Sequence, residues 1–95
     1  MSQTSAIPRT ERIAALLRAH FAPVILQVVD DSASHAGHAG AAPGGETHYN
    51  VKIVATAFAG MNRVARSHAV HAALAHEFAN GLHALSLKLL APDEA

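Results

Sequence analysis

Histidine is the residue whose type and placement in this chain best suit chemistry. The 95 residues include eight histidines and no cysteine. Disulfides are therefore excluded, and so are thiolate metal ligands supplied by the chain itself. Any metal that the chain binds alone must rest on imidazole and carboxylate groups.

Two of these histidines, His35 and His38, lie three residues apart in a stretch of alanine, glycine, serine and proline, residues 32–46 (SASHAGHAGAAPGGE). The glycines make this stretch pliable, so the pair could close on one metal ion. Two imidazoles are nevertheless too few for a stable site. Solvated loop histidines with no ligand role are the alternative interpretation, and the spacing alone does not decide between the two.

A further histidine, His83, stands before the apolar run ALSLKLL. Steps of two from Leu89 through Leu87 and Leu85 lead back to His83, as on one face of a β-strand. One hypothesis makes His83 a ligand that is held on a rigid strand and faces a second, mobile ligand from the loop. The alternative is a strand-end imidazole that is satisfied by a backbone carbonyl.

Basic side chains form the second candidate group. Arg63 and Arg66 share one face of a predicted helix, and with Lys52 and Lys88 they could mark a surface for phosphate or an acidic partner. A solvated helix surface is the alternative interpretation. Seven basic and seven acidic side chains cancel, so no overall field draws the chain to nucleic acid.

No catalytic arrangement stands out in the sequence. It has no nucleophile–histidine–acid pattern, no phosphate-binding glycine loop after a strand and few acidic residues for acid–base chemistry. We therefore expect a protein that is not an enzyme. The opening residues contain no signal peptide, and no apolar run reaches the roughly 20 residues of a membrane span, so we expect a cytoplasmic protein.

Periodicity predicts the elements that position these residues. Helical spacing favours a helix over 8–21 and a long helix over 63–79, the latter with a short second helix that Asn80-Gly81 closes. β-Branched residues predict a strand over 24–31 that is covered on both faces. Alternation predicts a half-buried strand over 47–53, and a third strand spans 82–90.

These elements predict one α+β domain over residues 1–95, with the order helix, strand, strand, helix, helix, strand. We expect two layers, with the helices on one face of a three-stranded sheet. The first two strands pair antiparallel, and a helical connection lets the third run parallel to a neighbour, so the sheet is mixed. Residues 1–7 and 91–95 are predicted to be flexible termini, and 32–46 a flexible loop.

The motifs, taken together, resemble the BolA family from about Ile13 to Leu89. They are VVDDSASH at the end of the first strand, THYNVKIV as the second, FAG followed by Arg66 on the long helix, and LHALSLKL at the third. Each is short, but the order and the distances are typical of this family. The resemblance implies a type II KH-like domain.

The resemblance also implies a role without catalysis, in which the protein pairs with a monothiol glutaredoxin. The two proteins share a [2Fe–2S] cluster in iron sensing or iron–sulfur trafficking. His83 matches the family's cluster ligand in the H-A-L motif, and His35 matches the place of the second ligand, with His38 as a near alternative. The partner and its glutathione then supply the sulfur that this chain lacks.

Bacterial members of the family are also described as DNA-binding regulators of stress response and cell morphology. The resemblance therefore implies an alternative function in which Arg63, Arg66, Lys52 and Lys88 contact DNA. Two departures weaken it. Family members carry Arg-His-Arg where this chain has Arg66-Ser67-His68, and the GXXG loop of KH domains is missing from residues 58–61.

Overall fold

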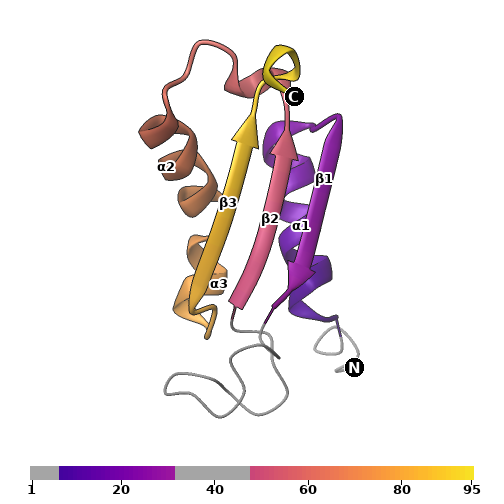
Figure 1. Cartoon of the computed structure of the whole chain (residues 1–95). Helices are drawn as coiled ribbons and strands as arrows, with labels where there is room; N and C mark the ends of the chain where they lie inside the picture. The colour runs from indigo at the N-terminus through magenta and orange to yellow at the C-terminus, as the bar shows by residue number, and fades with distance from the viewer. Residues whose placement is uncertain (1–6, 32–47) are drawn as a thin grey trace.

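The structure of the chain is a computed structural model that describes residues 7–31 and 48–95. Its elements follow the predicted order, with two short 3₁₀-helices in addition (Figure 1). They are α1 (Arg9–Phe21), β1 (Ile25–Asp30), β2 (His48–Val54), η3 (Thr56–Phe58), α2 (Arg63–Ala73), α3 (Ala75–Ala79), β3 (Ala84–Leu90) and η4 (Pro92–Glu94). The predicted α+β class and the predicted break in the long helix are both confirmed.

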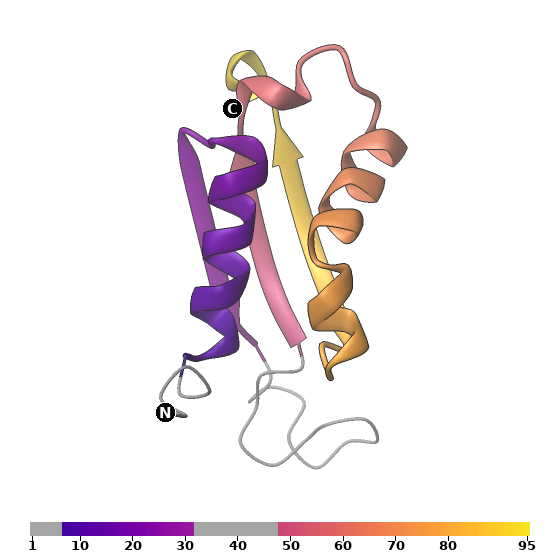
Figure 2. The same ribbon diagram turned by 180° about the vertical axis from the view of Figure 1, so that it is seen from behind.

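The sheet has the order β1-β2-β3, with β1 and β2 antiparallel and β2 and β3 parallel. The prediction of a mixed sheet is therefore confirmed. The helices α1, α2 and α3 all lie on one face, in front of the strands in Figure 2 and behind them in Figure 1. Because β2 and β3 are parallel, both strands begin at the same end of the sheet, where β1 ends.

Helix boundaries follow local chemistry. Helix α1 ends at Ala22, which takes a left-handed conformation with φ 45° just before Pro23, a residue that cannot continue a helix. Helix α2 begins after Asn62, whose Oδ1 accepts a hydrogen bond of 2.8 Å from the N–H of Ala65. Such an N-cap satisfies one of the unpaired amides of the first turn.

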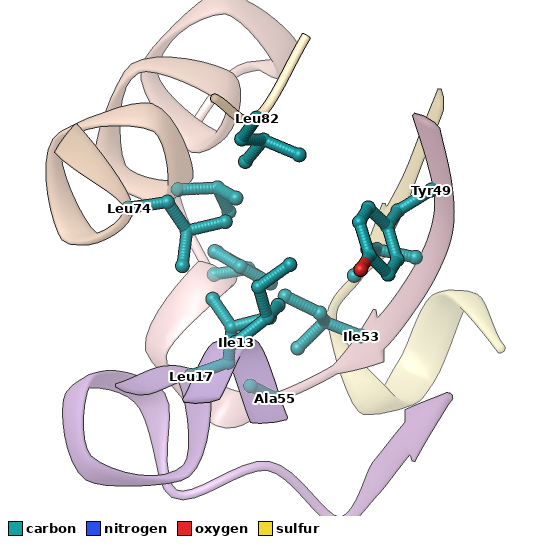
Figure 3. Packing of buried hydrophobic residues seen from close by; sticks show 10 residues of the cluster. Ile13, Leu17, Tyr49, Ile53, Ala55, Leu74 and Leu82 are labelled. Atoms are coloured by element: carbon teal, nitrogen blue, oxygen red, sulfur yellow. The ribbon is translucent and has the colours of Figure 1, made fainter. Parts of the chain in front are cut away.

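The core lies between the helices and the sheet. The alternation that predicts the second strand is confirmed, since Tyr49, Val51 and Ile53 of β2 are buried towards the helices. Side chains from two parts of the helical layer meet this strand, as Figure 3 shows for Ile13 and Leu17 of α1 and for Leu74 and Leu82, which flank α3. The cluster is completed by Ala55, Phe58 and Val70. It is mainly aliphatic, as the composition predicts.

The prediction that the first strand is covered on both faces is wrong. Val24 is 66% exposed, Val29 is 55% exposed and Ile25 is also exposed. The reason is that β1 is an edge strand of a sheet with only one helical layer, so its β-branched residues reflect strand preference and not two-sided burial.

The C-terminal residues 91–95, which the sequence predicts to be flexible, carry a short helix and side-chain contacts. Residues 92–94 form the 3₁₀-helix η4, and Glu94 accepts hydrogen bonds from Arg66 of α2 and from the N–H of Ala91. The guanidinium of Arg66 also donates to the carbonyl of Leu89 in β3. This contact fastens the chain end across the top of the sheet in Figure 1.

Candidate functional site

Two imidazoles meet at the end of the sheet where β2 and β3 begin. The ring centroids of His48 and His83 are 5.3 Å apart, and the ring planes are inclined by 32°. His48 is the first residue of β2 and pairs in register with Ala84, the first residue of β3, so His83 directly precedes that strand. The imidazole of His83 is exposed.

The first strand ends beside this histidine pair. The N–H of Asp31 donates to the carbonyl of His48 at 2.8 Å, and both residues line a hollow of about 140 Å³. Asp31 and His48 are also the residues that flank 32–47. The predicted ligands His35 and His38 lie outside the described residues, so their role stays a prediction.

The site can supply imidazole nitrogen but not a complete metal centre. Within 7–31 and 48–95 no group of three or more histidine, aspartate or glutamate side chains could hold a metal ion. Metal centres built on imidazole alone need at least three such ligands or a partner that completes the set. Within the described residues, His48 and His83 thus offer two imidazoles, fewer than a metal centre built on this chain alone would need.

Sequence reasoning missed His48, although a signal for it was present. In an alternating strand, His48 must face away from the buried Tyr49. The sequence predicts that the third strand runs parallel to a neighbour; because this neighbour is the second strand, the two strands begin at one end of the sheet. Only the register, which the sequence does not give, brings His48 next to His83.

The four predicted basic residues do not form one surface. Lys52 and Lys88 are register partners on the sheet face opposite the helices, where they line a hollow of about 330 Å³. Arg63 is exposed on α2, in the helical layer. A single basic face that includes all four residues is therefore not present.

Arg66, the fourth of these, is only 7% exposed and is held inside the fold. Its Nε donates to the carbonyl of Met61 at 2.9 Å, and Nη1 donates to Glu94 Oε1 at 2.6 Å. The hydrogen bond to Glu94 raises the pKa of Arg66, and the same bond holds the pKa of Glu94 below its usual range. These contacts give Arg66 a structural role and remove it from the predicted nucleic-acid surface.

The fold and the site define a class of protein. It is a small two-layer α+β domain in which the exposed His83 and the half-buried His48 lie together at one end of a mixed sheet. The family model described as BolA-like protein matches residues 17–94. The chain belongs to the BolA family, as the sequence motifs predict.

Relatives with known names are similar over most of this chain. Protein BOLA1, chloroplastic, from Arabidopsis thaliana is 44% identical over 89 residues, which are 92% of this chain and 56% of that protein. The DNA-binding transcriptional regulator BolA of Escherichia coli (strain K12) is 40% identical over 77 residues, 81% of this chain and 70% of that protein. This chain thus spans only about half the length of the Arabidopsis relative.

Solved structures confirm the fold. The BolA domain of SufE1 from Arabidopsis thaliana superposes with a TM-score of 0.83 at 41% identity, over 92% of this chain and 95% of that domain. BolA1 from the same plant superposes with a TM-score of 0.83 at 39% identity, over 94% of this chain and 98% of that chain. In the described part of this chain, no helix has the length and apolar character that a membrane crossing requires.

Proposed function

We propose that this chain is a non-enzymatic accessory protein that pairs with a monothiol glutaredoxin. The two proteins share a [2Fe–2S] cluster in iron–sulfur trafficking or iron sensing. The observation that carries the proposal is the exposed imidazole of His83, next to a second imidazole where β2 and β3 begin. Membership of the BolA family supports it.

The donor set suits a cluster that is shared between molecules. Iron–sulfur clusters are usually held by cysteine thiolates, but histidine can replace cysteine and then raises the reduction potential. This chain has eight histidines and no cysteine, so thiolates must come from the glutaredoxin and its glutathione. His83 would be the fixed ligand. His35, or His38, would be the second ligand from 32–47, and His48 is a third candidate that the structure adds.

The proposal is tested by anaerobic reconstitution with a monothiol glutaredoxin, glutathione, iron and sulfide. The mixed complex should show a visible circular dichroism spectrum that differs from that of the cluster-bridged glutaredoxin alone, with one copy of each protein. A spectrum identical to that of glutaredoxin alone, with no co-elution of this chain, would contradict the proposal.

Histidine-to-alanine variants then show which residue is the second ligand. A His35→Ala, His38→Ala double variant should change the spectrum if the loop supplies the ligand, and His48→Ala should change it if β2 does. When a nitrogen ligand is removed, another donor must replace it. Substitution of the true ligand therefore alters both the spectrum and the reduction potential of the cluster. Retention of the parent spectrum in the double variant would remove His35 and His38 from the site.

DNA binding by a transcriptional regulator is the second candidate function. Two observations favour it: the Escherichia coli relative carries that name, and Lys52 lies beside Lys88 on the open sheet face. A protein that contacts several phosphates should lose affinity steeply with salt, with a log–log slope of about −0.9 for each phosphate. Fluorescence anisotropy with duplex DNA tests this, and a Lys52→Glu, Lys88→Glu variant with unchanged affinity would contradict it.

A further inference from the structure

Three charged side chains connect α1 to α3, close to the histidine pair. Glu77 of α3 is only 2% exposed. Its Oε1 accepts hydrogen bonds from Arg9 Nε at 2.9 Å and Arg12 Nη2 at 3.0 Å, and its Oε2 accepts from Arg12 Nε at 3.0 Å. Hydrogen bonds from Arg12, followed by those from Arg9, lower the pKa of Glu77 despite its burial. The buried carboxylate is thus fully charged at neutral pH.

Arg9 also contacts the turn between α3 and β3. Its Nη2 donates to the carbonyl of Asn80 at 2.5 Å. The next residue, Gly81, has φ +111°, and a Cβ at this position would lie 3.3 Å from Arg9 Nη2. The backbone of the turn therefore takes its course around the Arg9 guanidinium, and glycine provides both the conformation and the space.

The turn is held from its other side by Leu82. The N–H of Leu82 donates to the carbonyl of Glu77 at 2.9 Å, and its side chain is buried in the core. Residues 80–82 are thus fixed by Arg9 on one side and by the core on the other. His83 is the next residue, so the geometry of this turn determines the position of the His83 backbone from which the imidazole projects.

We infer that Arg9 is a positioning residue for His83, because its contact with the Asn80 carbonyl sets the direction in which the imidazole is presented to a partner. The inference rests on the proposed function in that it concerns the same ligand. The hydrogen bonds of Arg9 within residues 7–31 and 48–95 go to Glu77 and Asn80, so its effect on His83 passes through the turn. The first helix, far from the third strand in sequence, therefore contributes to the ligand site.

Arg12 provides a matched control. It is also an arginine of α1 that bonds Glu77, but its remaining described hydrogen bond goes to the carbonyl of Ile7 and not to the turn. Arg9→Gln and Arg12→Gln each leave Glu77 with one arginine partner. Both variants should therefore fold and should lose stability, whereas only Arg9→Gln removes the bond to Asn80.

The first experiment uses the chain alone and reads the backbone at His83 by ¹⁵N relaxation. In the parent and in Arg12→Gln, the amide order parameter of His83 should stay near about 0.85, the value of rigid backbone. In Arg9→Gln it should fall below about 0.6, and the contact between the rings of His48 and His83 in NOE spectra should be lost. Equal order parameters at His83 in the two variants would overturn the inference.

Gly81→Ala disturbs the contact between Arg9 and the turn by changing the turn and leaving the arginine in place. The added methyl group should displace the Arg9 guanidinium and strain the backbone at a positive φ, so the order parameter of His83 should fall as in Arg9→Gln. Arg9→Lys keeps the charge, but its single nitrogen must serve both Glu77 and the carbonyl of Asn80. The order parameter of His83 in this variant should therefore lie between those of the parent and Arg9→Gln. A rigid His83 in Gly81→Ala would count against the inference.

The second experiment uses the complex with monothiol glutaredoxin and visible circular dichroism. Groups that orient a metal ligand typically contribute 10- to 100-fold to metal affinity, so Arg9→Gln should weaken cluster-bridged association about tenfold, and Arg12→Gln should leave it within about twofold. If His83→Ala keeps the parent spectrum, ligation by His83 fails while the relaxation test of Arg9 still stands. If His83→Ala loses the spectrum and Arg9→Gln behaves as Arg12→Gln, the inference fails alone.

Discussion

The two ends of the sheet are each fastened by an arginine–glutamate contact, but the two contacts differ in burial. At the His83 end, the side chain of Glu77 is 3% exposed and is shared by two arginines of α1. At the opposite end, Arg66 is the buried partner and Glu94 is 44% exposed. One end thus buries the acid among helices, and the other holds a chain terminus with an acid that remains in water.

This difference shows what each contact does. The pair of Arg66 and Glu94 joins η4 to α2 and to the end of β3. The cluster of Arg9, Arg12 and Glu77 borders the turn that leads to His83, whose imidazole is exposed. The chain thus makes the support of the candidate ligand rigid while the ligand itself stays accessible.

The largest effect is expected for Glu77→Gln. Replacing a buried carboxylate leaves two arginines without their ionic partner, and such changes cost about 2–4 kcal/mol of unfolding free energy when the partners keep some solvent contact. Urea denaturation followed by circular dichroism measures it. A loss below about 0.5 kcal/mol, the level of ordinary surface substitutions, would show that the cluster is not a support.

Glu94→Gln is the matched substitution at the other end of the sheet. We expect a smaller loss of unfolding free energy than for Glu77→Gln, because solvent screens the exposed carboxylate and the Gln side chain can still accept from Arg66. The same denaturation series compares the two variants. An equal loss of unfolding free energy in Glu94→Gln and Glu77→Gln would contradict the proposed difference between the two ends of the sheet.

Acid should separate the parent from these variants. The pKa values of Glu77 and Glu94 are both lowered by their arginine partners. Their contribution to stability is therefore present above the unfolded pKa of glutamate, about 4.3, and is lost as pH falls through the lower folded values. Unfolding free energies between pH 6 and 3 should fall in the parent and fall less steeply in Glu77→Gln. If the unfolding free energy of Glu77→Gln fell as steeply with pH as that of the parent, the charged form of Glu77 would not contribute to stability as we expect.

The smallest effect on stability is expected for the two imidazoles themselves. His83 is exposed and His48 half-buried at a strand end, so His83→Ala and His48→Ala should each change the unfolding free energy by no more than about 0.5–1 kcal/mol. Thermal or urea denaturation checks this. A larger loss at His83 would mean that the ring serves the fold, which is the structural alternative that the sequence leaves open.

Much of the fold could be predicted from periodicity and turn chemistry. The alternation of Tyr49, Val51 and Ile53 defines β2, and the spacing of Val70 and Leu74 defines α2 and its end, since each pattern has only one face to bury. The exposure of Val29 could not be predicted, because β-branched residues favour strands whether one face or both are covered.

The site was predictable only in part. His83 stands out because it precedes an apolar strand, but its neighbour His48 depends on strand register, and the support by Arg9 depends on a contact across 71 residues. Arg66 was assigned to a basic surface because charge in sequence does not distinguish a solvated arginine from one that is buried beside Glu94. Long-range pairing, which local patterns do not encode, explains each of these gaps.

The most direct test of the central claim is the visible circular dichroism of the glutaredoxin complex formed with His83→Ala. If His83 is a ligand, the spectrum of the mixed cluster should be lost or changed in sign and position, although the variant folds as the parent does. An unchanged spectrum in a folded His83→Ala complex would contradict ligation by this imidazole.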